Sequence, residues 1–581
     1  MTDATALPTT TAEPTHVAVT GIQRLWRREL DHYPPTRTRH RMLLLVVVSS
    51  VVMYYQQYVS GAVSASILTH YEMSFRFYLT VVVVSSVSGA VASLIASVAD
   101  RFGRANMVVL GLLMVGLVTC FGIPNTTTKW NFAAAVAVVG FFEGMVLVAT
   151  PALIRDFSPQ QRRGAAMGLW TLGPVLGSLT VSLVASNTLD HLHDWQDQFR
   201  IAGAVGLTVF VIALLFLREL APAIRDQIMT SLRERVLAEV RARGMDVENA
   251  LKRPFRQMAG FNTVVPALGV SLFLLMYLAA VGFFVIYFVS VFGFSQSEAN
   301  GLGNWFWSAD AVAVVLVGVA SDRLKVRKPF MLVGGVAAVV MGLVFASLAT
   351  RPHTSYDTFV VVIMLMSAAR GIAYAPWMAA YTETLESRNP ALVATGLAIW
   401  GWILRIVAAI SFLVVPFVVP SATPVADYGP HASALQAKYT AQIATLKLVQ
   451  PTTLAALQAD STNRKAQLAA VGQIARAADV SLATATADLI AASKIPAADR
   501  AFLASHGREV LAARAAAPKQ WQRWWYVCVV GELLFLPTIF LLVGRWRRKT
   551  AIADAAAPDR MVTAEFEELA SADEYVEGVS A

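Results

Sequence analysis

The chain has 581 residues, of which 56% are hydrophobic and only 15% are charged. Soluble globular proteins contain about 25% charged residues, so this composition excludes an ordinary soluble domain and indicates a polytopic membrane protein. The formal net charge is +9. We do not expect nucleic-acid binding, because the basic residues gather at the ends of apolar runs, where they report membrane topology. Cys120 and Cys528 both lie in apolar runs, so no disulfide framework is expected.

About 40 mostly polar residues precede the first apolar run, which is too long for the start of a cleavable signal peptide. Twelve apolar runs follow that can each cross a bilayer of about 30 Å. In lipid each must be a helix, because every backbone amide needs an internal partner. The first six runs are residues 42–68, 78–99, 107–123, 132–154, 165–185 and 201–217, and the others are 266–290, 301–320, 330–348, 359–380, 397–418 and 525–543.

Lysine and arginine concentrate in the loops on one side of these runs, which predicts that both termini are cytoplasmic and that the chain crosses the plasma (inner) membrane. The fold class expected is an all-α membrane protein of twelve helices in two pseudo-symmetric six-helix bundles. The segments are a cytoplasmic tail (1–41), the first bundle (42–217), a cytoplasmic linker (218–262), spans seven to eleven (263–419), an extracytoplasmic insert (420–524), span twelve (525–544) and a second cytoplasmic tail (545–581).

Two of these segments interrupt the regular pattern of spans. The linker carries Leu232, Val236, Leu237 and Val240 at helical spacing, which predicts an amphipathic surface helix. The insert is rich in alanine, has a periodic Leu/Ile pattern and contains prolines at 451 and 496, which predicts a small helical cap. Such a cap is either an inert lid or an element for gating or for binding a protein partner, since long loops are often functional.

A charged motif occurs twice, each time where an apolar run ends. Asp100-Arg101-Phe102-Gly103-Arg104 follows span two, and a stretch from Gly318 to Asp322-Arg323 follows span eight. The offset between the two aspartates is 222 residues (322 − 100). Similar offsets relate Glu143-Gly144 to Arg370-Gly371 and Asp156 to Glu383 (227 each). The repeat predicts two related six-helix halves, an architecture typical of transporters that rock about a central site.

On these motifs the chain resembles the major facilitator superfamily over residues 40–420 and 525–545. The first motif copy departs from the family pattern, with Ala96 where the family has glycine. The resemblance implies a gating role for Asp100, Arg101, Gly103, Arg104, Asp156, Gly318, Asp322, Arg323 and Glu383. We expect bonds across the cytoplasmic seam: Asp100 at the start of span eleven, Asp322 at the start of span five, Arg101 or Arg104 with Asp156, and Arg323 with Glu383. The alternative is that these positive loops only fix orientation.

Five ionisable residues fall inside spans, namely Glu143, Asp310, Arg370, Arg405 and Glu532. Each is costly in hydrocarbon and is therefore a functional hypothesis. Glu143 and Asp310 are the candidates for proton coupling, because desolvation favours the neutral form of a carboxyl group. The setting Gly140-Phe141-Phe142-Glu143-Gly144 resembles the organic-anion:proton symporter branch, in which that glutamate couples protons. Gln56-Gln57 and Val136 stand where that branch has an Asp-Arg pair and an arginine, and the alternative for Glu143 is a structural salt bridge.

Arg370 is the expected counter-charge for the solute, because its guanidinium can bind a carboxylate or phosphate in a bidentate manner. The alternative is permanent pairing with Asp310. We also expect an intramembrane ion pair between Asp310 and Arg405, and we place Glu532 near the outer surface, where it extends towards water or contacts the cap. The candidate substrate-binding residues are Tyr54, Gln56, Gln57, Tyr277, Arg370, Tyr374 and Trp377.

The favoured function is secondary transport of a small polar or anionic organic solute by proton-coupled symport in a monomer, without cofactor or metal. Glycines at 164, 168, 173 and 177 resemble the span-five motif of proton-coupled efflux antiporters, which keeps drug or metabolite efflux open. An enzyme is not expected, since the only metal-like cluster is the loop 190–194 (Asp-His-Leu-His-Asp) and no phosphate loop is present. A receptor that binds through the insert is the third alternative.

Overall fold

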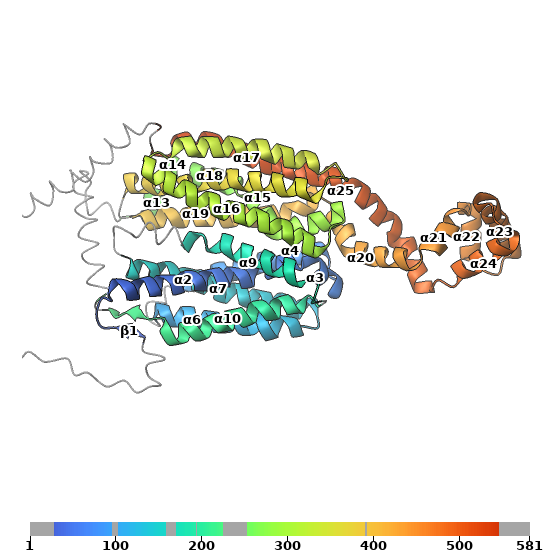
Figure 1. Ribbon diagram of the computed structural model, residues 1–581, viewed down its shortest axis with the longest axis horizontal. Coiled ribbons are helices and arrows are strands. Elements are labelled where there is room, and N and C mark those ends of the chain that lie inside the picture. Colours follow the sequence, from blue (N-terminus) through green and yellow to red (C-terminus); the bar gives the residue numbers. More distant parts are fainter. Residues whose placement is uncertain are drawn as a thin grey trace, which may run out of the picture.

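The computed structural model describes residues 28–95, 103–158, 170–192, 194–222, 224, 252–389, 392–544 and 546. Its helices form two groups that lie side by side along the long axis, with a thin helical projection at one end (Figure 1). We call the end with the projection the insert end. The opposite end, which holds β1, β2 and α13, is the linker end (Figure 1).

The first half contains the helices that precede residue 217. They are α2 (Thr36–Ala62), α3 (Ser64–His70), α4 (Phe75–Ile95), α6 (Arg104–Leu117), α7 (Lys129–Phe157), α9 (Gly173–Thr188) and α10 (Gln196–Phe216). A π-helical turn at Val118–Gly122 and a 3-10 turn at Ile123–Asn125 end the third span. Glycines at 140 and 144 let α7 lie against the backbone of α4, because a Cβ at Gly144 would stand 2.1 Å from the Gly89 carbonyl oxygen.

The second half contains α14 (Phe261–Phe273), α15 (Leu275–Tyr287), α16 (Gln296–Leu324), α17 (Lys328–Leu348), α18 (Tyr356–Arg388) and α19 (Val393–Val418). The seventh span is not one continuous helix. It breaks at Leu274, between α14 and α15, and ends in a π-helical turn at Phe288–Phe292. Discontinuous helices of this kind expose backbone carbonyl groups inside a bundle, where polar side chains can bind them.

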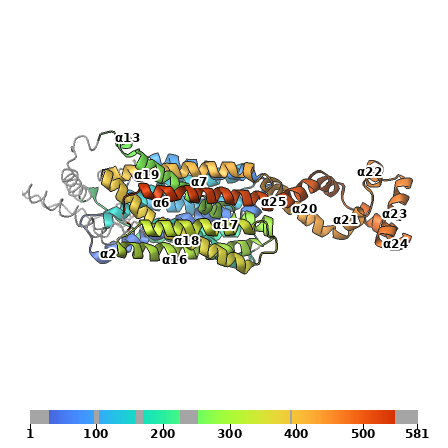
Figure 2. The ribbon, with the colours of Figure 1, turned by 90° about the horizontal axis from the view of Figure 1, so that it is seen from above.

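The projection consists of α20 (Ala422–Lys438), α21 (Thr440–Lys447), α22 (Pro451–Ala459), α23 (Arg464–Ala478), α24 (Leu482–Ser493) and the start of α25 (Ala497–Thr538). The turned view shows α20 and α25 running together from the bundle, with α21–α24 at the tip (Figure 2). The prolines at 451 and 496 stand at the starts of α22 and α25, as their inability to continue a helix predicts. Span twelve is therefore the end of a 42-residue helix that begins in the projection.

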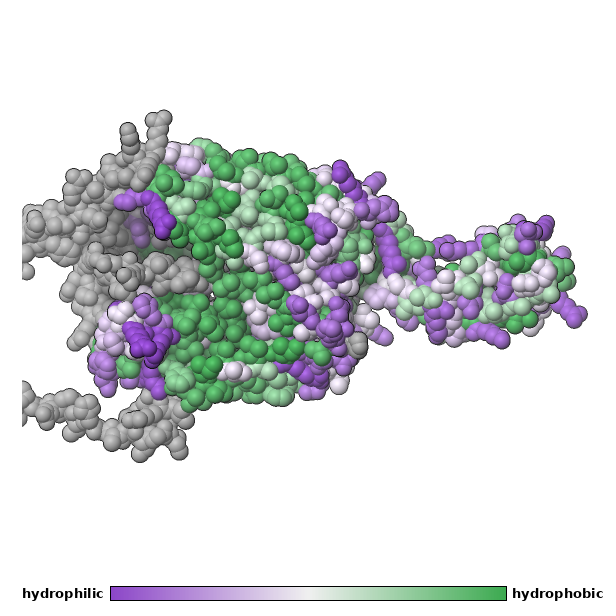
Figure 3. Space-filling model, in the orientation of Figure 1, coloured by the Kyte–Doolittle hydropathy of each residue, from purple (hydrophilic) through white to green (hydrophobic). Residues whose placement is uncertain are grey.

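The surface of the bundle carries a hydrophobic belt between its two ends, and the projection shows polar and apolar patches side by side (Figure 3). Large apolar side chains lie exposed along this belt on α16, α17 and α19, including Leu316, Val333 and Phe417. An exposed apolar surface of this extent is stable only in contact with lipid. Among the described residues, eleven helices are long and apolar enough to span a membrane. The predicted fifth span corresponds to α9, and residues 159–169, which precede it, lie outside the described part.

A two-stranded parallel sheet at the linker end joins β1 (Glu29–Leu30) to β2 (Glu219–Leu220), a pairing that the sequence analysis did not predict. It positions Arg28, whose guanidinium donates to the carbonyl groups of Ala213 and Leu214 at 3.1 and 2.8 Å. A cation at the end of α10 is favourable, because the helix dipole is negative there. The predicted amphipathic helix of the linker lies largely outside the described residues. The described elements that lie entirely within the linker are β2 and α13 (Pro254–Met258).

Hydrogen bonds join the two halves at the insert end. Asn300 donates to the Ala62 carbonyl oxygen at 3.1 Å, and Gln296 donates to the Ser66 hydroxyl at 2.7 Å. On α9, the carbonyl oxygen of Ser186 accepts a hydrogen bond from the Ser297 hydroxyl at 2.8 Å. The hydroxyl of Ser186 accepts another from the side-chain amide of Asn304 at 2.9 Å. The structure is therefore closed at the insert end.

Candidate functional site

Glu143 lies near the middle of α7 and is buried. Its neighbours Gly140 and Gly144 both face α4, which places the Glu143 carboxyl on the adjacent side of the helix. Arg405 of α19 is the cation whose field acts on this carboxyl, and the hydroxyl groups of Tyr54 and Tyr58 lie close enough to interact with it electrostatically. Glu143 thus stands where α2 and α7 of one half face α19 of the other.

Four tyrosines from both halves surround the space beside Glu143. Tyr54 and Tyr58 of α2 have ring centroids 5.5 Å apart, and Tyr277 of α15 neighbours both of them. Tyr374 of α18 completes the set through electrostatic contacts with Tyr54 and Tyr277. The structure therefore brings together Tyr54, Tyr277 and Tyr374 as a polar aromatic group at the centre of the bundle.

Asp310 and Arg405 do not form the expected ion pair. Asp310 is buried near the middle of α16, where its carboxyl packs against Gly371 and lies in the field of Arg370. Arg405 is instead exposed on α19 while its field acts on Glu143 and Tyr54. Helix rotation explains the difference, because sequence position gives the depth of a residue in the bundle but not the face on which it lies. Arg405 faces the space between the halves.

Arg370 occupies the core of the second half. Its guanidinium pairs with the Glu532 carboxylate of α25, and it donates to the Phe273 carbonyl oxygen at 2.5 Å. That carbonyl is free because the seventh span breaks at Leu274, so Arg370 caps the end of α14 and stands over the Phe273 ring. The prediction for Glu532 was wrong: its side chain is fully buried and does not reach the outer surface. Arg370 is paired in this structure, but with Glu532 rather than Asp310.

The three remaining predicted binding residues are Gln56, Gln57 and Trp377, of which Trp377 stacks on Tyr374 of the tyrosine group with ring centroids 6.3 Å apart. Gln56 is buried against Gly206 of α10, within the first half, and its amide has no hydrogen-bond partner. Gln57 is partly buried, and its side chain makes no hydrogen bond in the described structure. Trp377 is fully buried between Tyr381 and Trp400, at centroid distances of 4.8 and 5.6 Å, so it packs the core of the second half.

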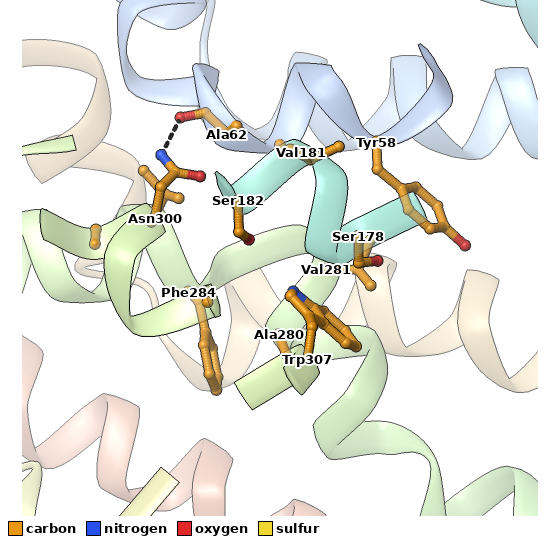
Figure 4. A pocket seen from close by; sticks show the side chains of 14 residues that line it. Tyr58, Ala62, Ser178, Val181, Ser182, Ala280, Val281, Phe284, Asn300 and Trp307 are labelled. Carbon is orange, nitrogen blue, oxygen red and sulfur yellow. Dashed lines mark hydrogen bonds between the residues drawn. The ribbon is translucent and has the colours of Figure 1, made fainter. Parts of the chain in front are cut away.

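The path from the tyrosine group to the insert end is nearly filled. A pocket of about 30 Å³ remains between α2, α9, α15 and α16, which is room for about one water molecule. Tyr58, Ser178 and Trp307 lie along it, and the bond from Asn300 to Ala62 crosses between the halves nearby (Figure 4). Gly61 and Gly303 permit this close approach, because a Cβ there would meet Val281 at 2.7 Å and Ser182 at 2.4 Å.

The first charged motif forms one of its expected bonds at the linker end. Arg104 binds Asp156 in a bidentate manner at 2.8 and 2.9 Å, and its backbone amide donates to Glu219 at 2.7 Å. Gly103 precedes α6 as its N-cap and has a φ of 88°, a left-handed conformation that favours glycine. Arg104 and Asp156 belong to the same half, so this bond does not cross the seam as expected. Asp100 and Arg101 lie outside the described residues.

The second charged motif uses a different arginine from the one predicted. Arg327, and not Arg323, bonds Glu383 at 3.0 Å and Asp322 at 2.5 Å, and all three residues belong to the second half. Arg323 is exposed, and a Cβ at Gly318 would meet nothing within 4 Å. The helix α16 ends at Leu324, so the chain turns back and brings Arg327 to face Glu383. The predicted partner of Asp322, the start of span five, lies outside the described residues.

Sequence reasoning also missed the polar contacts of the insert end. Asn300, Gln296 and Ser186 are ordinary polar residues near predicted span ends, and nothing in their spacing marks them as partners. Among the residues that the structure describes, no three His, Cys, Asp or Glu side chains are placed to hold a metal ion. His193 of the loop 190–194 lies outside that part.

Comparison with known proteins gives transporters throughout. A phosphoglycerate transporter protein of Salmonella typhimurium is 23% identical over 333 residues, covering 55% of this chain and 70% of its own length. A cis,cis-muconate transport protein of Acinetobacter baylyi is 22% identical, covering 47% of this chain and 62% of its own. The multidrug resistance protein MdtG of Serratia proteamaculans is 33% identical, but over only 21% of this chain and 29% of its own.

Solved structures agree in fold. A bacterial homologue of the human lysosomal transporter Spinster, in an inward-facing and unoccupied conformation, aligns with a TM-score of 0.54 at 15% identity. The alignment covers 87% of this chain and 99% of that one. A D-xylose-proton symporter aligns with a TM-score of 0.50 at 14% identity, over 64% of this chain and 90% of that one. The profile of the Major Facilitator Superfamily matches residues 45–411, so the chain belongs to that superfamily of membrane transporters.

Proposed function

We propose that this transporter carries a small organic anion together with protons by alternating access, with Glu143 as the proton carrier. The observation behind this proposal is the placement of a buried carboxyl group between the halves, in the field of an exposed cation. Glu143 and Arg405 come from opposite halves, and neither makes an ion pair or hydrogen bond through its side chain in the described structure. Ionisable groups in that position are functional by default.

The two charges suggest how proton and solute would bind together. A carboxylate or phosphate that binds Arg405 would stand near Glu143, where an ionised carboxylate repels it. A proton on Glu143 removes that repulsion, so the anion and the proton favour each other's binding, as symport requires. This assignment moves the solute's counter-charge from Arg370, which is bound to Glu532, to Arg405.

The tyrosine group supplies the remaining contacts for a solute. Tyr54, Tyr277 and Tyr374 offer hydroxyl groups and ring faces, and both halves contribute. Relatives that are named for phosphoglycerate and muconate transport favour an anionic solute of modest size. We propose Asp310 as a second proton-coupling group, because it is buried beside Tyr277 and Tyr374 without a salt bridge.

Proton-coupled efflux is the second candidate, supported by similarity to a multidrug resistance protein. The glycines of span five give it less support. Gly173 and Gly177 lie against Tyr54, where a Cβ would stand 3.4 and 2.5 Å from its side chain, so close packing accounts for them. The remaining glycines at 164 and 168 lie outside the described residues.

The test is solute-dependent proton flux in proteoliposomes that enclose a pH-sensitive dye, with phosphoglycerate and cis,cis-muconate as the first probes. In Glu143→Gln we expect this flux to fall at least about a hundredfold, as the loss of a proton-transferring group predicts. Exchange of labelled solute, which needs no net proton movement, should continue. Glu72→Gln, an exposed carboxyl group, is the matched control and should behave as wild type.

Arg405→Gln separates the roles of the two charges. Losing the counter-charge should weaken solute binding by about 1.5–3 kcal/mol, the range for hydrogen bonds to charged groups.

Proton flux in the direction opposite to the solute would favour efflux over symport. Equal proton flux in Glu143→Gln and wild type would remove Glu143 from coupling and make Asp310 the next residue to test.

A further inference from the structure

The tip of the projection encloses a cavity that is unrelated to the central site. Its volume is about 930 Å³, within the range of small-molecule pockets. Aliphatic side chains from every helix between α21 and α25 line it, among them Leu446, Leu457, Leu468, Leu489 and Leu503. The cavity is thus a pocket with apolar walls, on a part of the chain that projects away from the membrane-spanning bundle (Figure 2).

The projection does not fill this space with its own side chains. Leu468, Ile490 and Leu511 line the cavity yet remain 73%, 53% and 60% exposed. A Cβ at Gly507, on the same wall, would meet nothing within 4 Å. The buried clusters of the projection are small: one consists of Val449, Ala470, Ile474 and Ala485, and another of Leu435, Tyr439 and Ile495. Apolar surface left open to water is unfavourable by about 25 cal/mol per Å², so an apolar ligand would stabilise the tip.

The charges around the cavity are of one sign. Residues 420–524 contain eleven lysines and arginines and six acidic residues. The lining includes five of the basic residues and none of the acidic ones, namely Lys447, Arg464, Arg500, Arg508 and Arg514. Arg514 is held by the Gly429 carbonyl oxygen and the Ser433 hydroxyl. The side chains of the other four make no hydrogen bond or ion pair in the described structure, so they are available to an anion.

We propose that this cavity, which we call the tip cavity, binds a single-chain amphiphilic anion, a long-chain fatty acid. The aliphatic chain would cover the exposed leucine and isoleucine side chains. The carboxylate would bind to the arginines of α23 and α25, which form charge-assisted hydrogen bonds with carboxylates. The tip cavity lies outside the path of the transported solute, so the proposal stands whether or not the coupling scheme above is correct.

The test uses the full-length protein in nanodiscs of zwitterionic lipid and a diazirine analogue of palmitate as the probe. After illumination and digestion, mass spectrometry locates the labelled peptides. We expect labels within residues 464–511, in addition to background labelling on lipid-facing spans. Decanoate should displace the label from these peptides, and decyltrimethylammonium, which has the same chain and the opposite charge, should not.

Two variants probe the two halves of the recognition. Gly507→Phe adds a ring to the cavity wall at a position where a Cβ meets no atom within 4 Å, and the triple change Arg464→Gln, Arg500→Gln and Arg508→Gln removes three of the five lining charges. Each should lower labelling of residues 464–511 at least about tenfold, equal to about 1.4 kcal/mol of binding, while labelling of the spans stays constant. Gly472→Phe, on α23 but outside the lining, is the matched control.

Four outcomes would overturn the proposal. The first is labelling confined to the membrane spans, and the second is unchanged labelling of the tip in Gly507→Phe and in the triple variant. The third is equal displacement by decyltrimethylammonium, which would reduce the site to an apolar surface without charge selection. Displacement by lysophosphatidic acid but not by palmitate would assign the site to a phosphate head group and overturn the carboxylate assignment.

Discussion

Arg370 illustrates how a single buried charge is held in this protein. Its guanidinium bonds the Glu532 carboxylate and the carbonyl oxygen that the break at Leu274 leaves free. Both side chains are almost fully buried, and Glu532 Oε2 has no further partner. A buried ion pair adds little net stability, but removing one member leaves the other charge uncompensated. The pair therefore fixes α18 and α25 in one register.

We therefore expect Glu532→Gln to lower the free energy of unfolding by about 3–5 kcal/mol, because Arg370 keeps its charge without a counter-ion. Glu383→Gln makes the same chemical change at a carboxyl group that is 40% exposed and also bound to an arginine. That control should cost less than about 1 kcal/mol. Denaturant unfolding of both variants in the same detergent provides the measurement, and equal losses would contradict a special role for burial.

Individual residues show which features could be predicted from the sequence and which could not. Apolar runs and charged motifs gave the spans, the two halves and the family resemblance, since a helix in lipid has few alternatives. Glu143 could be singled out by its depth in a span. The partner of Arg370 could not, because Glu532 lies 162 residues away and the pairing depends on how each helix is rotated. The exchange of Arg323 for Arg327 at Glu383 has the same origin, one turn beyond the helix end.

At the scale of elements, the first helix of the projection is anchored to the opposite half of the bundle. Asp427 of α20 accepts a hydrogen bond from the backbone amide of Phe75, the first residue of α4, at 2.7 Å. A carboxylate at a helix N-terminus satisfies a free amide and interacts favourably with the dipole. Burial raises the pKa of Asp427 to about 6, with Glu509 acting in the same direction, and Arg76 and the bond to Phe75 oppose the shift.

This anchor predicts a pH dependence. A docked Asp427 has a pKa of about 6, above the ordinary value of 3.8. The docked arrangement therefore binds more protons between these values, so docking of α20 is favoured at low pH and weakens as the pH rises through 6. Asp427→Asn keeps a neutral acceptor and should remove the dependence.

Spin labels at Thr127 and Thr440, in a background without Cys120 and Cys528, would report the docking distance at pH 5 and pH 8. We expect the wild-type distance distribution to broaden at pH 8 and the Asp427→Asn distribution to stay the same. A wild-type distribution that does not change with pH would exclude this anchor as a titrating contact.

At the scale of the whole molecule, hydrogen bonds from Asn300, Gln296, Ser297 and Asn304 hold the two halves together at the insert end. Alternating access requires the contacts at the insert end to break in each cycle. The bond between Gln296 and Ser66, at 2.7 Å, is one of these contacts. The insert end is therefore the closed side of the central site in this arrangement, where a pocket of only about 30 Å³ remains.

A cross-link across this contact should stop transport. In a background without Cys120 and Cys528, we expect Ser66→Cys with Gln296→Cys, joined through disulfide bonds by a short bifunctional methanethiosulfonate, to lose solute flux and to regain it on reduction. The control pair Tyr71→Cys with Thr126→Cys lies within the first half, where the two side chains approach to 2.5 Å, and should stay active when cross-linked. Flux that persists in the first pair would show that the insert end need not open.

The length of α25 has a mechanical consequence. At about 1.5 Å per residue, its 42 residues form a rod of about 63 Å that carries both the tip of the projection and Glu532. The helix contains Pro518 and Pro537, and Pro518 is the one that lies between the tip and Glu532. A proline cannot donate to the hydrogen-bond ladder, so bending between the tip and Glu532 is concentrated at Pro518. A movement of the tip therefore reaches Glu532 and its ion pair with Arg370 only if the helix stays rigid at Pro518. The flexibility of the helix at this proline sets how strongly the tip and the buried ion pair are coupled.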